Sequence, residues 1–98
     1  MPTNVLSEKL QKELVNITKK GDIVEAIKEL ITRELIRKKN KYTFMVNNFE
    51  KKYHMEFKDF EKAHKDQKMD YELEKDYFDW DMAVTVLEDI EEEMKEME

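Results

Sequence analysis

A glutamate and a histidine three residues apart are the sequence's clearest candidate for metal chemistry. Glu61 and His64 have the Glu-x-x-His spacing that places both side chains on one helix face, as in di-iron carboxylate sites. Such sites need a second pair of this kind, but the other histidine, His54, is preceded at that distance by Lys51. The chain also has no cysteine, so thiolate ligands are excluded. We therefore expect no metal, and we interpret His64 as a partly exposed histidine on a short helix.

Motifs for nucleophilic catalysis and phosphate binding are missing. Ser7 is the only serine and has no histidine near it in the sequence, and Gly21 is the only glycine. A glycine-rich phosphate loop therefore cannot form. Helical nucleotide pyrophosphohydrolases hold Mg²⁺ between acidic residues of two facing helices, whereas the acidic residues here concentrate near one end of the chain. We expect a protein that is not an enzyme and uses no cofactor, with a metal-dependent nucleotide hydrolase as the alternative.

Charge is distributed unevenly along the chain, whose net charge is −6. Residues 1–69 carry 16 basic and 11 acidic side chains, whereas residues 70–98 carry 2 basic and 13 acidic side chains. Such asymmetry indicates a charged partner or an internal complement. The acidic end is either a solvated helix face or a surface that docks on a basic partner. For the second interpretation the candidate residues are Asp79, Asp81, Glu88, Glu91 and Glu92.

The composition predicts long amphipathic helices in one domain, residues 1–98. Charged residues make up 43% and hydrophobic residues 40%, with one glycine and one proline, which is too few turn residues for many short strands. No apolar run approaches the ~18 residues of a membrane span, and no signal-peptide pattern is present. We therefore expect an all-α cytoplasmic protein without a membrane segment. The one dense basic run, residues 37–41, lies inside a helical pattern, so we expect no direct nucleic-acid binding.

Hydrophobic periodicity predicts four helices. The expected bounds are 4–20, 22–53, 56–67 and 76–97. The second helix runs through a polar gap at residues 38–39, because nothing there breaks a helix. Residues 68–75 are expected to form a connector, with a short extended piece as an option. The two long helices predict an antiparallel hairpin.

Capping residues support the ends of the first two helices. Thr3 or Asn4 can cap the start of the first helix, and Gly21 stands where a helix commonly ends in a left-handed residue. Asp22 and Glu25 have the spacing of a capping box at the start of the second helix. These positions predict a tight turn between the two helices.

The last helix carries a heptad seam of apolar residues. Its members are Trp80, Ala83, Leu87, Ile90, Met94 and Met97. Trp80 is either a core anchor, which we favour, or a partner-binding hot spot; for Tyr77, off the seam, the two interpretations are even. Because a chain of this length has few means of covering two long apolar stripes, we expect a homodimeric bundle.

Two aromatic segments resemble those of small prokaryotic proteins of the antitoxin type. Residues 49–61 are FEKKYHMEFKDFE, and residues 76–83 are DYFDWDMA. They are similar to an FExxYGMSFxxFE segment followed by a DxFxWxxA helix. His54 stands where that pattern has a helix-ending glycine, and Glu56 stands where it has a serine helix cap.

The resemblance implies a non-catalytic helical protein that neutralises a small toxin. Combined with the acidic end, it gives an expected partner, a small basic protein whose surface the acidic helix covers. The aromatic residues Tyr53, Phe57 and Tyr77 are further candidates for partner contact. The less specific alternative is a structural dimerisation module.

Overall fold

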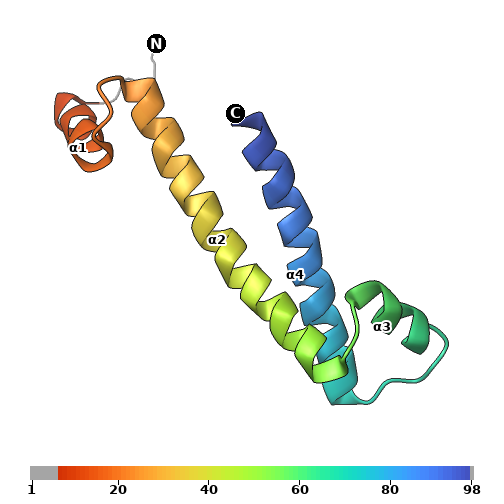
Figure 1. Ribbon diagram of the computed structural model, residues 1–98. Coiled ribbons are helices and arrows are strands. Elements are labelled where there is room, and N and C mark those ends of the chain that lie inside the picture. Colours follow the sequence, from red (N-terminus) through yellow and green to blue (C-terminus); the bar gives the residue numbers. More distant parts are fainter. Residues whose placement is uncertain (1–6, 98) are drawn as a thin grey trace, which may run out of the picture.

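The computed structural model describes residues 7–97, and within them the chain forms four α-helices and no strand (Figure 1). The helices are α1 (Glu8–Thr18), α2 (Ile23–Tyr53), α3 (Phe57–His64) and α4 (Tyr71–Glu96). The two long helices α2 and α4 pack against each other as an antiparallel hairpin, and α3 lies in the connection between them. The all-α class and the four helices of the sequence-based prediction are confirmed.

The α4 seam packs against α2 within the same chain. Trp80, Ala83 and Ile90 are buried, while the other members of the seam are half-buried. Leu35 on α2 is also buried at this interface. The apolar stripe that predicted a helical bundle therefore provides the hairpin's internal contact.

Helix α2 is continuous from Ile23 to Tyr53, as predicted, and the polar gap causes no break. Asp22 caps it, because its side chain accepts a hydrogen bond from the Val24 amide at 3.0 Å. Glu25 lies 3.8 Å from Lys28. The exposed lysines of the gap face solvent, so they do not interrupt the packed face of the helix.

The ends of α1 differ from the prediction. Ser7 is the N-cap and accepts from the Leu10 amide at 3.2 Å; the expected caps, Thr3 and Asn4, lie outside the described residues. The left-handed residue that ends the helix is Lys19, with φ 62°, and Gly21 does not have a positive φ. The Thr18 hydroxyl donates to the Leu14 carbonyl and accepts from the Lys20 amide, and these bonds favour an earlier end to the helix.

Helix α4 begins five residues earlier than predicted, at Tyr71 rather than 76. Asp70 is its N-cap and accepts from the Leu73 amide at 2.8 Å. Residues 71–75, which were expected in the connector, are therefore helical. The observed connector is 65–70 rather than 68–75. Helix α3 ends at His64, three residues before the predicted end. α4 starts at Tyr71 because the aspartate at its N-cap, Asp70, satisfies a free amide of the first turn.

The described hairpin is elongated. Its radius of gyration is 19.6 Å, whereas a compact domain of this length has about 13 Å. We call the end that contains α3 the closed end and the end that contains residues 23–35 and 90–97 the open end. The two long helices converge at the closed end and diverge toward the open end (Figure 1). Within residues 7–97, no helix combines the length and apolar character that crossing a membrane requires.

Candidate functional site

The closed end is built around one cluster of aromatic rings. Trp80 stacks on Phe49 and Tyr53, with ring centroids 5.4 and 5.8 Å apart. Phe57 and Phe60 complete the cluster at 5.4 and 5.0 Å from Trp80. Trp80 and Phe60 are fully buried, and the Trp80 Nε1–H has no hydrogen-bond partner among the described residues. These rings fix the angle between α2, α3 and α4, and Trp80 acts as their central packing residue.

A cationic side chain and a hydroxyl fasten α2 to α4 beside this cluster. The Lys52 ammonium lies 2.6 Å from Asp76 and 3.0 Å from Glu72. The Tyr53 hydroxyl donates to the same Asp76 carboxylate at 2.5 Å. Burial opposes ionisation of Asp76, but the hydrogen bonds from Lys52 and Tyr53 outweigh it and lower the Asp76 pKa. Burial, followed by the hydrogen bond to Asp76, raises the pKa of Tyr53.

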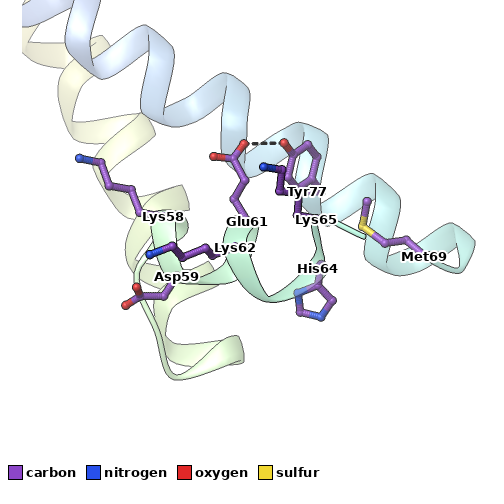
Figure 2. A pocket seen from close by; sticks show the side chains of 8 residues that line it. All are labelled: Lys58, Asp59, Glu61, Lys62, His64, Lys65, Met69 and Tyr77. Carbon is purple, nitrogen blue, oxygen red and sulfur yellow. Dashed lines mark hydrogen bonds between the residues drawn. The ribbon is translucent and has the colours of Figure 1, made fainter. Parts of the chain in front are cut away.

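Tyr77 connects α4 to α3. Its hydroxyl donates to the Glu61 carboxylate at 2.6 Å, and this bond raises the pKa of Tyr77 (Figure 2). The Tyr77 ring is half-buried and lies 5.6 Å from the Phe57 ring. The structure thus brings Tyr53, Phe57 and Tyr77, the aromatic residues that the sequence offered for partner contact, to the same end of the hairpin. Tyr53 on α2 binds Asp76 on α4, and Tyr77 on α4 contacts Phe57 and Glu61 on α3.

Beside Tyr77 is a hollow of about 730 Å³ (Figure 2). It is lined by Lys58, Asp59, Glu61, Lys62, His64, Lys65, Met69 and Tyr77. Glu61 points toward Tyr77, and His64 points away from it with Nδ1 3.0 Å from the Phe60 carbonyl oxygen. Between residues 7 and 97, no three histidine, aspartate or glutamate residues are grouped so that they could hold a metal ion. Lysines and carboxylates are mixed in this hollow, so its charge favours neither anion nor cation.

The acidic candidates on α4 do not share one face. Asp81, Glu88 and Glu92 follow one another at i, i+7 and i+11, which places them on one side of the helix, and all are exposed. Glu91 is exposed beside them, whereas Asp79 is half-buried and lies 3.5 Å from Lys75. The ion pairs between described residues involve none of the four exposed carboxylates. Their negative charge therefore faces solvent.

Two of these carboxylates line a groove of about 470 Å³ between α2, α3 and α4, which we call the acidic groove. Its lining residues are Val46, Glu50, Glu56, Phe57, Lys58, Glu61, Asp81, Val84, Thr85 and Glu88. Its half-buried Val46, Phe57 and Val84 side chains supply apolar surface. Five carboxylates and one lysine surround them. The groove thus combines apolar contact area with strong negative charge.

Sequence reasoning offered only three of the ten lining residues of the acidic groove for partner contact. It identified Phe57, Asp81 and Glu88, but not Glu50 or Glu56, since these lie on α2 and at the start of α3. Acidic residues scattered among lysines carry no signal of their own. The available signal was the resemblance of residues 49–61, which contain both glutamates.

Comparisons with protein-family models, with curated proteins and with solved structures find no match to this chain. It is an all-α helical hairpin with an aromatic closed end and an acidic groove.

Proposed function

We propose that this protein is a non-catalytic interaction protein of the antitoxin type, which neutralises a small basic protein by covering its basic surface. The acidic groove carries the proposal. It places five carboxylates around apolar side chains on one side of the hairpin. Asp81 and Glu88 also belong, with Glu92, to a row of exposed carboxylates along α4, which we call the acidic face.

The chemistry of the groove suits a basic segment with apolar side chains. Val46, Phe57 and Val84 offer apolar contact, while the surrounding carboxylates attract lysine and arginine. Fields of opposite sign accelerate association more than they strengthen affinity. If the partner normally binds RNA through a basic surface, that surface would bind the carboxylates of the acidic groove in place of RNA phosphates.

The remaining candidate residues have different roles in this proposal. Tyr53, Phe57 and Tyr77 hold the three helices that form the groove, and Glu91 flanks the acidic face. We leave Asp79 out of the contact surface, because it lies on another side of α4 beside Lys75. We also propose that the protein acts in the cytoplasm as a homodimer.

The proposal is tested by sequencing the neighbouring genes for a small basic protein and measuring the kinetics of its association with this chain. The variant Asp81→Asn, Glu88→Gln, Glu92→Gln removes three carboxylates from the acidic face. The control variant Asp89→Asn, Glu93→Gln removes two exposed carboxylates that lie about 80–120° around the same helix from Asp81. Since steering depends on where the charge lies, we expect the first variant to slow association about tenfold at low salt and the control to slow it much less.

Salt concentration supplies the second arm. The difference between the two variants should shrink at high salt, because exposed charges are screened over about 8–10 Å at physiological ionic strength. Association that is independent of salt and equal for both variants would contradict the proposal. Hydrolysis of nucleoside triphosphates by the pure protein in the presence of magnesium would favour the enzyme alternative instead.

A further inference from the structure

The apolar face of α2 continues beyond the part that α4 covers. Val24, Ile27, Ile31 and the buried Leu35 follow one another at i, i+3, i+7 and i+11, so they lie on one side of the helix. The first three side chains are 53%, 37% and 43% exposed. We call Val24, Ile27 and Ile31 the open-end stripe. It extends the internal contact face of the hairpin into solvent.

The arrangement of the helices explains why the stripe is uncovered. α4 diverges from α2 toward the open end (Figure 1). Its last apolar residues, Met94 and Met97, are half-buried. α1 packs on α2, but buried Ala26 lies on a different side of α2 from the stripe. Neither neighbouring helix therefore shields it.

The whole elongated chain exposes more surface than a compact monomer of its mass. The chain has 7838 Å² of accessible surface, whereas a compact monomer of 12.0 kDa exposes about 6,000 Å². A standard protein interface buries about 800 Å² on each partner. The excess surface of the open hairpin exceeds that requirement.

Charge at the open half of the hairpin is self-complementary. Residues 33–41 of α2 contain five basic and one acidic side chain, and residues 88–96 of α4 contain six acidic and one basic side chain. The ion pairs between described residues join none of these basic side chains to the acidic run. Two such surfaces related by a two-fold axis present each basic run to the partner's acidic run.

We propose that a second copy of this chain docks on the open-end stripe, so that the open ends of two hairpins pack together and complete a helical bundle. This inference rests on the homodimer proposed above and gives it a surface. The dimer surface shares only Glu88 with the acidic groove, whose other lining residues, such as Phe57 and Glu61, lie toward the closed end.

The test compares oligomeric mass in solution by sedimentation equilibrium. The parent should have twice the 12.0 kDa chain mass at micromolar concentration. The variant Ile27→Asp, Ile31→Asp should have the mass of a single chain and keep the parent's helix content. The control Phe44→Asp should remain dimeric, because Phe44 is 67% exposed on a different side of α2.

Cross-linking tests the same surface without adding charge. The chain has no cysteine, so Ile27→Cys and Phe44→Cys each introduce one thiol. A short bifunctional maleimide should join two copies through position 27 and not through position 44. If the aspartate variant fails to fold, the cross-linking result alone tests whether the open-end stripe is the dimer surface.

The outcomes separate the two proposals. A dimeric parent whose mass is unchanged by Ile27→Asp, Ile31→Asp, with no cross-link at position 27, overturns the surface and leaves the homodimer standing. A parent that remains a single chain at all concentrations overturns both. Glu88 and Glu92 also belong to the acidic run of the dimer surface, so the Asp81→Asn, Glu88→Gln, Glu92→Gln variant is weighed by sedimentation as well. Slower association by a variant that stays dimeric reports on the acidic groove alone.

Discussion

Trp80 shows how one side chain joins three helices. Its ring contacts Phe49 and Tyr53 from α2 and Phe57 and Phe60 around α3, and it is fully buried. Its N–H lacks a hydrogen-bond partner among the described residues, which lowers the net benefit of burying it. The area and shape of its ring, rather than a hydrogen bond, account for the contribution of Trp80 to the packing.

The first prediction concerns this residue. Trp80→Ala should lower the free energy of unfolding by about 3–5 kcal/mol, because it leaves a cavity among packed rings. Urea melts followed by circular dichroism measure the change. Phe78→Ala is the control on the same helix; its ring is 58% exposed, and its loss should change stability by less than about 1 kcal/mol. Similar losses for the two variants would show that Trp80 is not the central packing residue.

Asp76 gives the second prediction, which concerns pH. Its pKa is lowered in the folded chain because the hydrogen bonds from Lys52 and Tyr53 outweigh burial. A carboxyl whose folded pKa lies below its unfolded value stabilises the fold above the unfolded pKa, and this contribution is lost as pH falls through the folded pKa. Asp76→Asn should therefore lower stability by about 1–3 kcal/mol at neutral pH, and the difference from the parent should vanish well below pH ~4.

Urea melts of both proteins between neutral pH and low pH measure this difference. The control is Glu72→Gln, which removes the other carboxylate that contacts Lys52. The Glu72 side chain is 77% exposed, so its removal should have an effect below about 1 kcal/mol. A difference between Asp76→Asn and the parent that persists unchanged in acid would contradict the assigned role of the Asp76 carboxylate.

The turn between α2 and α3 determines how α3 is oriented relative to α2. His54 ends α2 in the left-handed region, with φ 57°, and its amide donates to the Glu50 carbonyl at 2.8 Å. Glu56 begins α3 as an N-cap whose side chain makes no capping hydrogen bond. The turn thus forms with two residues that suit it less well than glycine and serine.

The third prediction follows from this turn. His54→Gly removes the steric cost of a β-carbon at positive φ, and Glu56→Ser supplies a capping oxygen. Each change should raise the free energy of unfolding by about 0.5–1 kcal/mol. The control Lys51→Gly lies inside the last turn of α2 and should instead lower it by about 1 kcal/mol. A destabilised His54→Gly variant would show that the histidine ring makes a contact that matters more than the backbone strain.

As a whole, the molecule has two chemically different surfaces at its two ends. The acidic groove lies at the closed end, beside α3, and the open-end stripe lies on the first part of α2. A homodimer joined through the open ends would carry two acidic grooves at its outer ends. Two identical sites on one assembly increase the effective concentration of a partner that is itself multivalent.

In the whole molecule, the uneven charge of the chain corresponds to two surfaces that use the acidic residues of α4. The acidic residues of α4 contribute to both surfaces, since Asp81 and Glu88 line the acidic groove and the run 88–96 supplies the acidic part of the charge pattern at the open half of the hairpin. Internal ion pairs between α2 and α4 occur at Lys52. Most of the negative charge is therefore available for contacts with other molecules.

The sequence was sufficient to predict the features of this protein that depend on local spacing. The continuity of α2, the cap at Asp22 and the burial of Trp80, Ala83 and Ile90 follow from helical periodicity and from side chains a few residues apart. Where local signals were weak, the bounds were wrong: the left-handed residue is Lys19 rather than Gly21, and α4 begins at Tyr71.

The tertiary structure was needed for everything that depends on how helices meet. Helical spacing places Asp81 and Glu88 on one side of α4, but it does not show that Glu50 and Glu56 stand across a groove from them. It also does not show that α4 diverges from α2 and leaves Ile27 and Ile31 exposed. The angle of the hairpin is set by rings from three helices and by the turn at His54, which are contacts between residues far apart in the chain. Local periodicity carries no information about such an angle.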